Sequence, residues 1–310
     1  MKVAVLKGGR SLERGVSLRS AARVEDALVR LGHDVLSIDV GPDLVKLLEA
    51  DKPDVAFVAM HGVGGEDGTA QELLEILGIP FTGPAASACS RCMDKAQAKQ
   101  IMREAGVPTP DWFAFSETAF RELGAADALS GLEQSLGFPL VVKPSRGGSS
   151  LGVRFAAAAG EVPQALVAAF SYDDRVLLER FVEGRELAVS VLGDEALPVV
   201  EAIIAGGDRY DFEARYEIGR TRFVCPAELS DSERRAVTEA ALATYRALGC
   251  TSFARVDLIL GADGPGVLEA NAIPGLTDTS LLPQAAETAG MSFERLVEKI
   301  LDLALHPAAA

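Results

Sequence analysis

The chain has 310 residues, 48% of them hydrophobic and 24% charged, which is typical of a globular protein large enough for about two or three domains. Its 45 acidic residues outnumber its 30 Lys and Arg residues, and the net charge of −15 argues against a nucleic-acid partner, because a phosphate backbone needs a basic surface. The N-terminus lacks the apolar segment of a signal peptide, and no apolar run approaches membrane-spanning length. We therefore expect a cytoplasmic protein with no nucleic-acid or membrane partner.

The first part of the chain alternates helices with apolar strands at 3–7, 35–40 and 55–60. This order predicts a βαβ unit with a parallel sheet. Ligands bind at the carboxyl ends of such strands, where residues 8–17 and 61–68 form loops that contain glycine.

Glu13 follows the Gly8-Gly9 pair by about one helical turn. Its carboxylate could meet the ammonium group of an amino-acid ligand, or it could be a solvated residue that the helix dipole favours in a first turn. Position alone does not separate the two interpretations. The loop lacks the G-x-G-x-x-G pattern, which argues against a dinucleotide site.

Two of the four cysteines, Cys89 and Cys92, have the C-x-x-C spacing of redox and zinc sites. A second such pair is missing, and the three histidines are scattered along the chain. We expect reduced thiols that act as small residues on a helix.

Asp94 is expected to cap a helix that runs to Ala105 and carries Lys95 in its first turn, where the dipole mildly disfavours a cation. A strand ending at Lys143 leads into a loop at 145–152 that is rich in Gly and Ser. Such a loop exposes backbone N–H groups and suits a mobile cover over phosphate groups. It is not a Walker A loop. The alternatives are a solvated Lys95 and a flexible hairpin without a ligand.

Three strands follow, at 176–181, 187–192 and 197–203. The segment from Glu179 to Val182 has backbone groups and an aromatic residue of the kind that hold a flat base. A turn is expected at 183–186. Residues 206–223 are polar and rich in Arg and Tyr, and they predict a long active-site lid that is mobile without ligand.

After a helix opened by a capping box at Ser230, a β-hairpin at 253–271 carries a dense set of polar groups. Because side chains alternate along a strand, Arg255 and Asp257 share one face, as do Glu269 and Asn271. Pairing would bring the four groups together above an apolar sheet. Carboxylates this close repel unless a cation separates them, and Asp, Glu and Asn oxygens suit Mg²⁺ with phosphate. A buried ion pair of Arg255 is the alternative, but four polar groups on one face favour a metal–phosphate site.

Six segments resemble, in order and spacing, the D-alanine–D-alanine ligases of the ATP-grasp superfamily: GGRSLERGVSLRS, HGVGGEDGTAQELLEILGIPFTG, MDKAQAK, VVKPSRGGSSLGV, FARVDLIL and LEANAIPGLTDTSLLP. The resemblance covers nearly the whole chain. It implies an α/β, three-domain ATP-grasp architecture with ATP between the second and third parts. These parts would be an N-terminal parallel-sheet substrate-binding domain at 1–93, a central α+β subdomain at 94–180 and a C-terminal α+β catalytic subdomain at 181–310.

The resemblance also implies roles for single residues. Those implied to hold ATP are Lys95, Lys143, Ser150, Glu179, Val182 and Glu186. Those implied to bind two Mg²⁺ ions, for which Mn²⁺ could substitute, are Asp257, Glu269 and Asn271. The implied catalytic set is Glu13, Ser149, Tyr216, Arg255 and Gly275. The residues implied to contact the amino-acid substrates are Glu13, His61, Ser280 and Leu281.

The reaction that the resemblance implies begins when the carboxylate of one D-alanine attacks the γ-phosphate of ATP. The amine of a second D-alanine then attacks the D-alanyl phosphate, and D-alanyl-D-alanine forms for peptidoglycan precursor synthesis. Arg255 and the Gly275 N–H would stabilise the oxyanion. The family further implies a homodimer.

Some positions depart from the family pattern: Arg215 stands where Lys is usual, and Gly15 interrupts an acidic run. Tyr216, in contrast, is similar to the residue of dipeptide-forming members. A ligase with D-serine or D-lactate as second substrate, and a nucleotide-binding protein without catalysis, are the alternatives.

Overall fold

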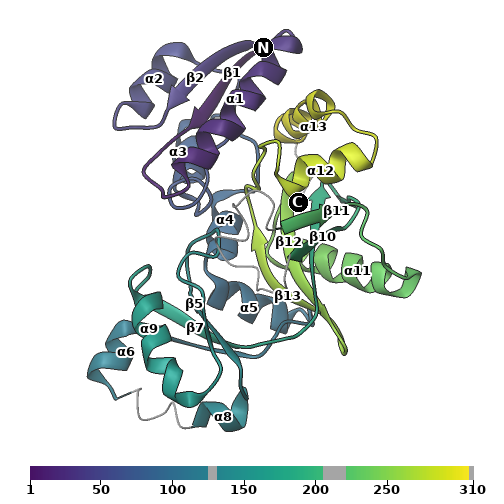
Figure 1. Cartoon of the computed structure of the whole chain (residues 1–310). Helices are drawn as coiled ribbons and strands as arrows, with labels where there is room; N and C mark the ends of the chain where they lie inside the picture. Colours follow the sequence, from purple (N-terminus) through teal and green to yellow (C-terminus); the bar gives the residue numbers. More distant parts are fainter. Residues whose placement is uncertain (125–130, 205–220, 307–310) are drawn as a thin grey trace.

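The computed structural model describes residues 1–124, 131–204 and 221–306, and Figure 1 shows three parts. The N-terminal part, at the top, is a parallel sheet with helices, as predicted. Its strands, in the order β2-β1-β3, are β1 (Lys2–Lys7), β2 (Asp34–Asp39) and β3 (Val55–Val58). Its helices are α1 (Arg14–Arg30), α2 (Leu44–Asp51) and α3 (Thr69–Leu77). The middle strand β1 is buried on both faces, which explains its uninterrupted apolar sequence.

The second part, at the lower left of Figure 1, is an antiparallel sheet with its own core. Its strands, in the order β4-β7-β5-β6, are β4 (Trp112–Ser116), β5 (Leu140–Pro144), β6 (Arg154–Ala156) and β7 (Arg175–Arg180). Its helices are α6 (Glu117–Glu122), α8 (Leu132–Ser135), η2 (Ala159–Glu161) and α9 (Val162–Phe170). Apolar residues of β5, β7 and α9 form this core, beside a cluster of three rings in which Phe115 stacks on Phe120 and meets Phe170 edge-on.

The third part is built on the central hairpin. Its strands are β8 (Arg185–Leu192), β9 (Glu195–Ala196), β10 (Val200–Ile204), β11 (Thr221–Val224), β12 (Phe253–Gly261) and β13 (Gly264–Asn271). They pair in the order β11-β10-β8-β12-β13, with β9 on β8. Its helices are α11 (Asp231–Ala247), α12 (Leu281–Thr288) and α13 (Phe293–Leu305). The predicted capping box of Ser230 and Glu233 opens α11.

Two short helices connect the parts: α4 (Ala86–Met93) and α5 (Lys95–Glu104). Asp94 caps α5 by accepting from the backbone N–H groups of Ala96 and Gln97, as predicted. Cys89 and Cys92 lie on α4 as buried free thiols, also as predicted. Burial raises the pKa of the Cys89 thiol well above its usual range, so it stays protonated.

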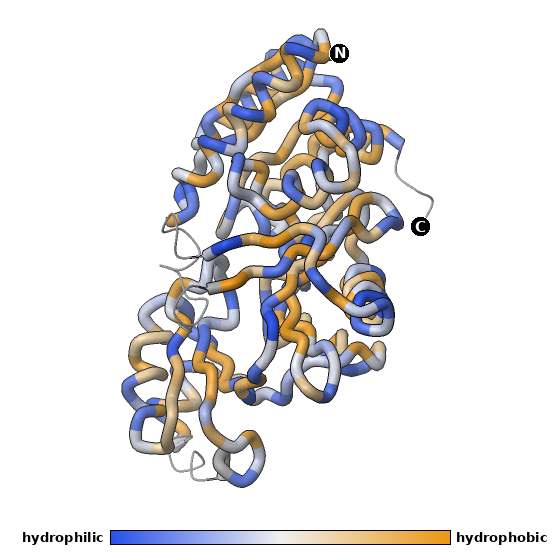
Figure 2. Tube along the Cα trace, turned by 45° about the vertical axis from the view of Figure 1, so that its right-hand side comes forward, coloured by the Kyte–Doolittle hydropathy of each residue, from blue (hydrophilic) through white to orange (hydrophobic). Residues whose placement is uncertain are grey.

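One continuous core runs from the N-terminal sheet through α4 and α5 to the hairpin and α13. Figure 2 shows hydrophobic segments along the interior strands, whereas the outer helices alternate between hydrophobic and hydrophilic along their length, as amphipathic helices do. The N-terminal and C-terminal parts are therefore fixed to each other by packing. Within the described residues, no helix is both long and apolar enough to cross a bilayer.

Several boundaries of the predicted elements were wrong. The strand expected at 197–203 begins only at Val200, and the strand expected at 55–60 ends at Val58. Residues 221–223, placed in the loop at 206–223, belong to β11, whose pairing with β10 could not be read from its mixed polar sequence. Arg185 and Glu186, placed in a turn, begin β8, because β8 pairs with β12 as far as Leu260. The rest of the predicted lid, residues 206–220, lies outside the described residues.

Candidate active site

The hairpin of β12 and β13 has the register that the alternation of its sequence predicts. Arg255 lies opposite Asn271, and Asp257 lies opposite Glu269. All four side chains are partly exposed on one face, whereas intervening residues such as Val256 and Ala270 are buried below. A register shift directly after Asp257 marks a bulge, a feature that often re-aims side chains beside active sites.

Basic side chains compensate both hairpin carboxylates. Arg255 donates from Nε and Nη2 to the two oxygens of Asp257 at 2.7 and 2.8 Å, and Asn271 Nδ2 donates to Asp257 Oδ2 at 3.1 Å. Lys95 Nζ lies 3.4 Å from Glu269 Oε2. The ion pair that was the alternative interpretation of Arg255 is therefore present, and it forms inside the predicted four-residue cluster. Lys95 is not a solvated residue, since only 11% of its side chain is exposed.

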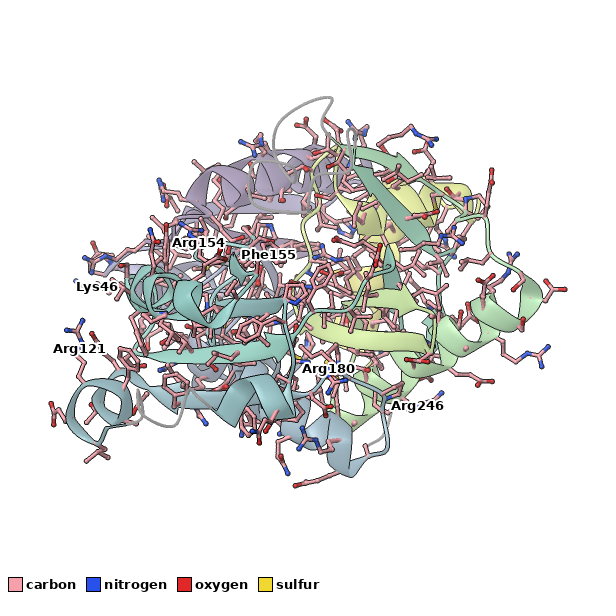
Figure 3. The ribbon with its side chains drawn as sticks, turned by 60° about the horizontal axis from the view of Figure 1, so that its bottom comes forward. Lys46, Arg121, Arg154, Phe155, Arg180 and Arg246 are labelled. Atoms are coloured by element: carbon pink, nitrogen blue, oxygen red, sulfur yellow. The ribbon has the colours of Figure 1, made fainter. Side chains whose placement is uncertain are left out.

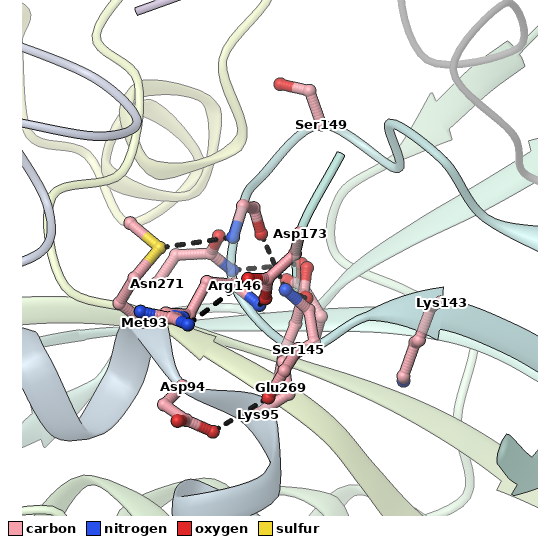
Figure 4. Close-up of polar contacts among 12 residues, drawn as sticks. Met93, Asp94, Lys95, Lys143, Ser145, Arg146, Ser149, Asp173, Glu269 and Asn271 are labelled. Carbon is pink, nitrogen blue, oxygen red and sulfur yellow. Dashed lines mark hydrogen bonds and ion pairs between the residues drawn. The ribbon is translucent and has the colours of Figure 1, made fainter. Parts of the chain in front are cut away.

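The glycine-rich loop is tied to the start of α5, as Figure 4 shows. Lys95 Nζ donates to the Gly147 carbonyl at 2.6 Å, and Ser145 Oγ donates to Asp94 Oδ1 at 2.8 Å. Ser149 lies at the tip of the loop, away from the contacts of Lys95 and Asp94. Ser149 and Ser150 both have positive φ, at 56° and 57°, a strained conformation that clusters at functional sites in proteins.

A cavity of about 690 Å³ lies between the second and third parts. Its walls are the loop and strands β5 and β7 on one side, and β8, β10 and the hairpin on the other. Phe155 of β6 also lines it, whereas Lys46 and Arg121 project from the edge of the molecule in Figure 3. The predicted site residues that line the cavity are Lys95, Lys143, Ser150, Glu179, Val182, Glu186, Asp257, Glu269 and Leu281.

Lys143 and Glu179, which line this cavity, belong to a buried ion cluster. Lys143 Nζ donates to Glu179 Oε1 at 2.8 Å, and Lys99 Nζ lies 2.6 Å from Glu179 Oε2. Burial raises the pKa of Glu179, but the charges of Lys143 and Lys99 outweigh burial and leave the pKa below its usual value. Lys99 was missed from the sequence. The sequence feature that could have indicated a role for Lys99 is its spacing of four residues from Lys95, which puts both lysines on one face of α5.

Glu13 lies at a contact between the first and second parts. It precedes α1, and its Oε1 accepts a hydrogen bond from Ser149 Oγ at the tip of the glycine-rich loop. The backbone approaches so closely that a Cβ at Gly148 would lie 2.9 Å from Glu13 Oε2, and one at Gly62 would lie 2.5 Å from it. Glu13 is therefore enclosed by two loops and is not a solvated first-turn residue.

His61 connects the N-terminal sheet to the loop that contains Gly275. Its side chain is 3% exposed, and its Nδ1 faces two acceptors, the Ile273 carbonyl at 3.1 Å and Glu66 Oε1 at 3.2 Å. In the neutral ring Nδ1 therefore carries the proton, and Nε2 accepts from Ser20 Oγ at 3.0 Å. Ser20 Oγ in turn accepts from the Leu276 N–H at 3.1 Å. This relay holds the backbone on both sides of Gly275.

Replacing Ser20 with Ala is expected to lower the free energy of unfolding by about 1–3 kcal/mol, because it leaves two fully buried groups without a partner. These are the Leu276 N–H and His61 Nε2. Urea denaturation would measure the loss. The exposed neighbour Arg19 gives the control, because Arg19→Ala should change stability by less than about 0.5 kcal/mol. Equal stability of Ser20→Ala and the parent protein would contradict the relay.

The other predicted residues lie nearby, with one exception. Ser280 Oγ accepts from the Thr277 N–H at 3.0 Å in the turn before α12, and a Cβ at Gly275 would lie 2.7 Å from it. Leu281 begins α12 and reaches the cavity. Gly15 is exposed near the start of α1. Tyr216, with Arg215, lies outside the described residues.

The hairpin donors fit a divalent cation that arrives together with phosphate groups. Within the described residues, no group of three or more His, Cys, Asp or Glu side chains could hold a metal. Asp257 and Glu269 face each other with the Asn271 amide beside them, and such oxygens suit Mg²⁺ when phosphate oxygens complete its shell. Arg255 and Lys95 meanwhile supply the positive charge that the two carboxylates need.

Family models match most of the chain: that of the D-ala D-ala ligase C-terminus matches residues 101–302, and that of the D-ala D-ala ligase N-terminus matches residues 44–84. The D-alanine–D-alanine ligase of Moorella thermoacetica is 41% identical over 99% of this chain and 100% of its own length. That of Anaeromyxobacter dehalogenans strain 2CP-C is 44% identical over 97% of this chain and 96% of its own.

Solved structures agree with these relatives. The Bacillus anthracis D-alanine–D-alanine ligase complexed with ATP has a TM-score of 0.84 and 33% identity, covering 98% of this chain and 97% of that one. The VanG D-Ala:D-Ser ligase of Enterococcus faecalis has a TM-score of 0.82 and 28% identity, covering 98% and 99%. With matches over nearly its full length in sequence and in fold, the chain belongs to the D-alanine–D-alanine ligase family.

Proposed function

We propose that this protein is an ATP-dependent ligase that joins two D-alanine molecules through a D-alanyl phosphate. The observation that carries the proposal is that predicted site residues gather at one cavity and along the glycine-rich loop that borders it. Paired Asp257 and Glu269 lie on one wall of the cavity, and Lys143 and Glu179 lie on another. The glycine-rich loop contacts Lys95 through Gly147 and Glu13 through Ser149. Relatives named for this activity, and a neighbour solved with ATP, support it.

ATP is proposed to lie in the cavity with its base beside Glu179 and Val182, its ribose at Glu186 and its phosphates toward Lys95 and Lys143. The glycine-rich loop would cover the phosphates through its N–H groups, with Ser150 on the cavity side. Asp257, Glu269 and Asn271 are proposed to hold two Mg²⁺ ions, with Mn²⁺ as a substitute. When bound, these ions would neutralise charge on the transferring phosphoryl group.

The two amino acids are proposed to meet at the open end of the hairpin. Glu13 would bind the ammonium of the first D-alanine, with His61 beside it, while Ser149 and Tyr216 complete the hydrogen-bonded set. Ser280 and Leu281 would position the carboxylate of the second. Arg255 and the Gly275 N–H would stabilise the oxyanion when the second amine attacks the acyl carbonyl and phosphate leaves.

The wider setting is part of the same proposal. We propose peptidoglycan precursor synthesis in the cytoplasm as the role, a homodimer as the assembly, and a division at 1–93, 94–180 and 181–310. The separate core of the second part supports the central unit. A D-serine second substrate is the nearest alternative, because the VanG D-Ala:D-Ser ligase shares the fold over the whole chain.

Phosphate release from ATP and Mg²⁺ tests the proposal, with D-alanine alone and then with D-serine or D-lactate added, and with the products identified by mass. The expected result is release with D-alanine alone and a D-alanyl-D-alanine product. If D-alanyl-D-serine or D-alanyl-D-lactate forms in preference to D-alanyl-D-alanine, the second substrate is D-serine or D-lactate and not D-alanine. ATP binding without phosphate release under any condition would indicate a nucleotide-binding protein without catalysis.

A further inference from the structure

Lys99 is a fully buried cation that the proposed reaction does not use. It lies on α5, one turn after Lys95, and its side chain is 0% exposed. Its Nζ contacts Glu179 Oε2 at 2.6 Å and the Pro110 carbonyl at 3.3 Å, and it also donates to Thr109 Oγ1. It does not line the cavity. A buried ammonium is costly unless it is paired, so this position calls for an explanation in terms of its partner.

The partner is shared between two lysines that differ in access to the cavity. Glu179 uses Oε1 for Lys143 and Oε2 for Lys99. Lys143 lines the cavity, whereas Lys99, on α5, is buried and does not line it. If Lys143 turns toward the phosphates of a nucleotide, Glu179 loses one of its two cations. A buried carboxylate left with no cation is strongly disfavoured.

We propose that Lys99 is a positioning residue that keeps Glu179 ionised and in place, so that Lys143 is free to leave Glu179 for the nucleotide phosphates. This inference rests on the proposed function, because it needs a triphosphate in the cavity. Lys99 contacts no nucleotide atom in this scheme and acts through its partner. An ionised Glu179 can also accept a hydrogen bond from the amino group of a purine base, because a carboxylate without a proton only accepts.

The test is a comparison of triphosphate and nucleoside binding in Lys99→Met, which keeps most of the apolar stem and removes the charge. Without Lys99, Lys143 stays with Glu179, and the phosphates lose a cation that adenosine never uses. We expect the Kd of ATP to rise by roughly 10- to 100-fold and that of adenosine by much less. Calorimetry with each compound gives the ratio of the two constants. A lysine that only supports packing would change both constants together, which would overturn the proposal.

Two further variants separate the charge effect from general damage. Lys46→Met removes an exposed lysine that projects from the surface in Figure 3, and it should leave both constants unchanged. Glu179→Gln removes the buried charge that Lys99 balances. In that background Lys99→Met should have less than about a third of its effect on the Kd of ATP. An undiminished effect in the double variant would overturn the proposal.

A pH series on the unaltered protein tests the same idea without a variant. Burial lowers the pKa of Lys99 to about 8. The charge of Glu179 opposes this shift, whereas the charges of Lys143 and Arg103 add to it. The uncharged groups Trp112 and Thr109 also contact Lys99. Above that pH Lys99 loses its charge and Glu179 depends on Lys143. The affinity for ATP relative to adenosine should therefore fall between about pH 7 and about pH 9. A constant ratio would overturn the proposal, whereas no binding of ATP at any pH would instead overturn the proposed function.

Discussion

Replacing Asp257 with Asn is expected to lower kcat for dipeptide formation by about 100- to 1,000-fold. The carboxylate has two roles in the proposed site: it offers a charged oxygen as a ligand to a divalent cation, and it accepts hydrogen bonds from Nε and Nη2 of Arg255. An amide is a weaker ligand and can accept only one of the two hydrogen bonds. The substitution therefore weakens the phosphate site and frees the guanidinium that is proposed to stabilise the oxyanion.

The measurement is steady-state dipeptide formation over a Mg²⁺ titration, accompanied by ATP binding in excess EDTA. We expect the Mg²⁺ concentration for half-maximal rate to rise, while ATP binding without metal stays close to that of the parent protein. Asp263→Asn is the matched control, because Asp263 is exposed in the turn of the same hairpin. A similar loss in both variants, or full activity of Asp257→Asn at the usual Mg²⁺ concentration, would refute the metal assignment.

The register of this hairpin was predictable because period-two alternation fixes which side chains share a face. Arg255, Asp257, Glu269 and Asn271 interrupt an apolar pattern at alternate positions, and a slip of one residue in the pairing would have turned the two polar groups of one strand to the buried face. Similarly, Asp94 and Ser230 were predictable as helix caps, since a cap depends only on its own next three residues. Interactions of this local kind account for most of the fold that the sequence predicted.

Long-range polar contacts could not be predicted in the same way. Lys99 has the local sequence of an ordinary helical lysine, and its burial against Glu179 and Thr109 depends on segments outside its own helix. Ser20 has nothing in its neighbourhood to indicate that it accepts from Leu276, which is 256 residues away. Both residues act through tertiary packing, and their partners follow from how the three parts meet.

The hydrogen bond between Glu13 and Ser149 joins two loops that come from different parts of the chain. One loop precedes α1, and the other is the proposed phosphate cover between β5 and β6. A ligand ammonium bound to Glu13 would therefore also favour the position of the phosphate cover. Binding of the first amino acid and enclosure of ATP are expected to be coupled through this contact.

Replacing Glu13 with Gln is expected to raise the KM for the first D-alanine by about 100-fold, because the amide cannot balance the substrate ammonium in a partly buried site. The Kd of ATP alone should change little, since Glu13 does not line the nucleotide cavity. Initial rates over a wide range of D-alanine concentrations, with ATP calorimetry, measure both. Asp26→Asn, an exposed carboxylate on the same helix, is the control and should behave like the parent protein. An unchanged KM in Glu13→Gln would show that the ammonium binds elsewhere.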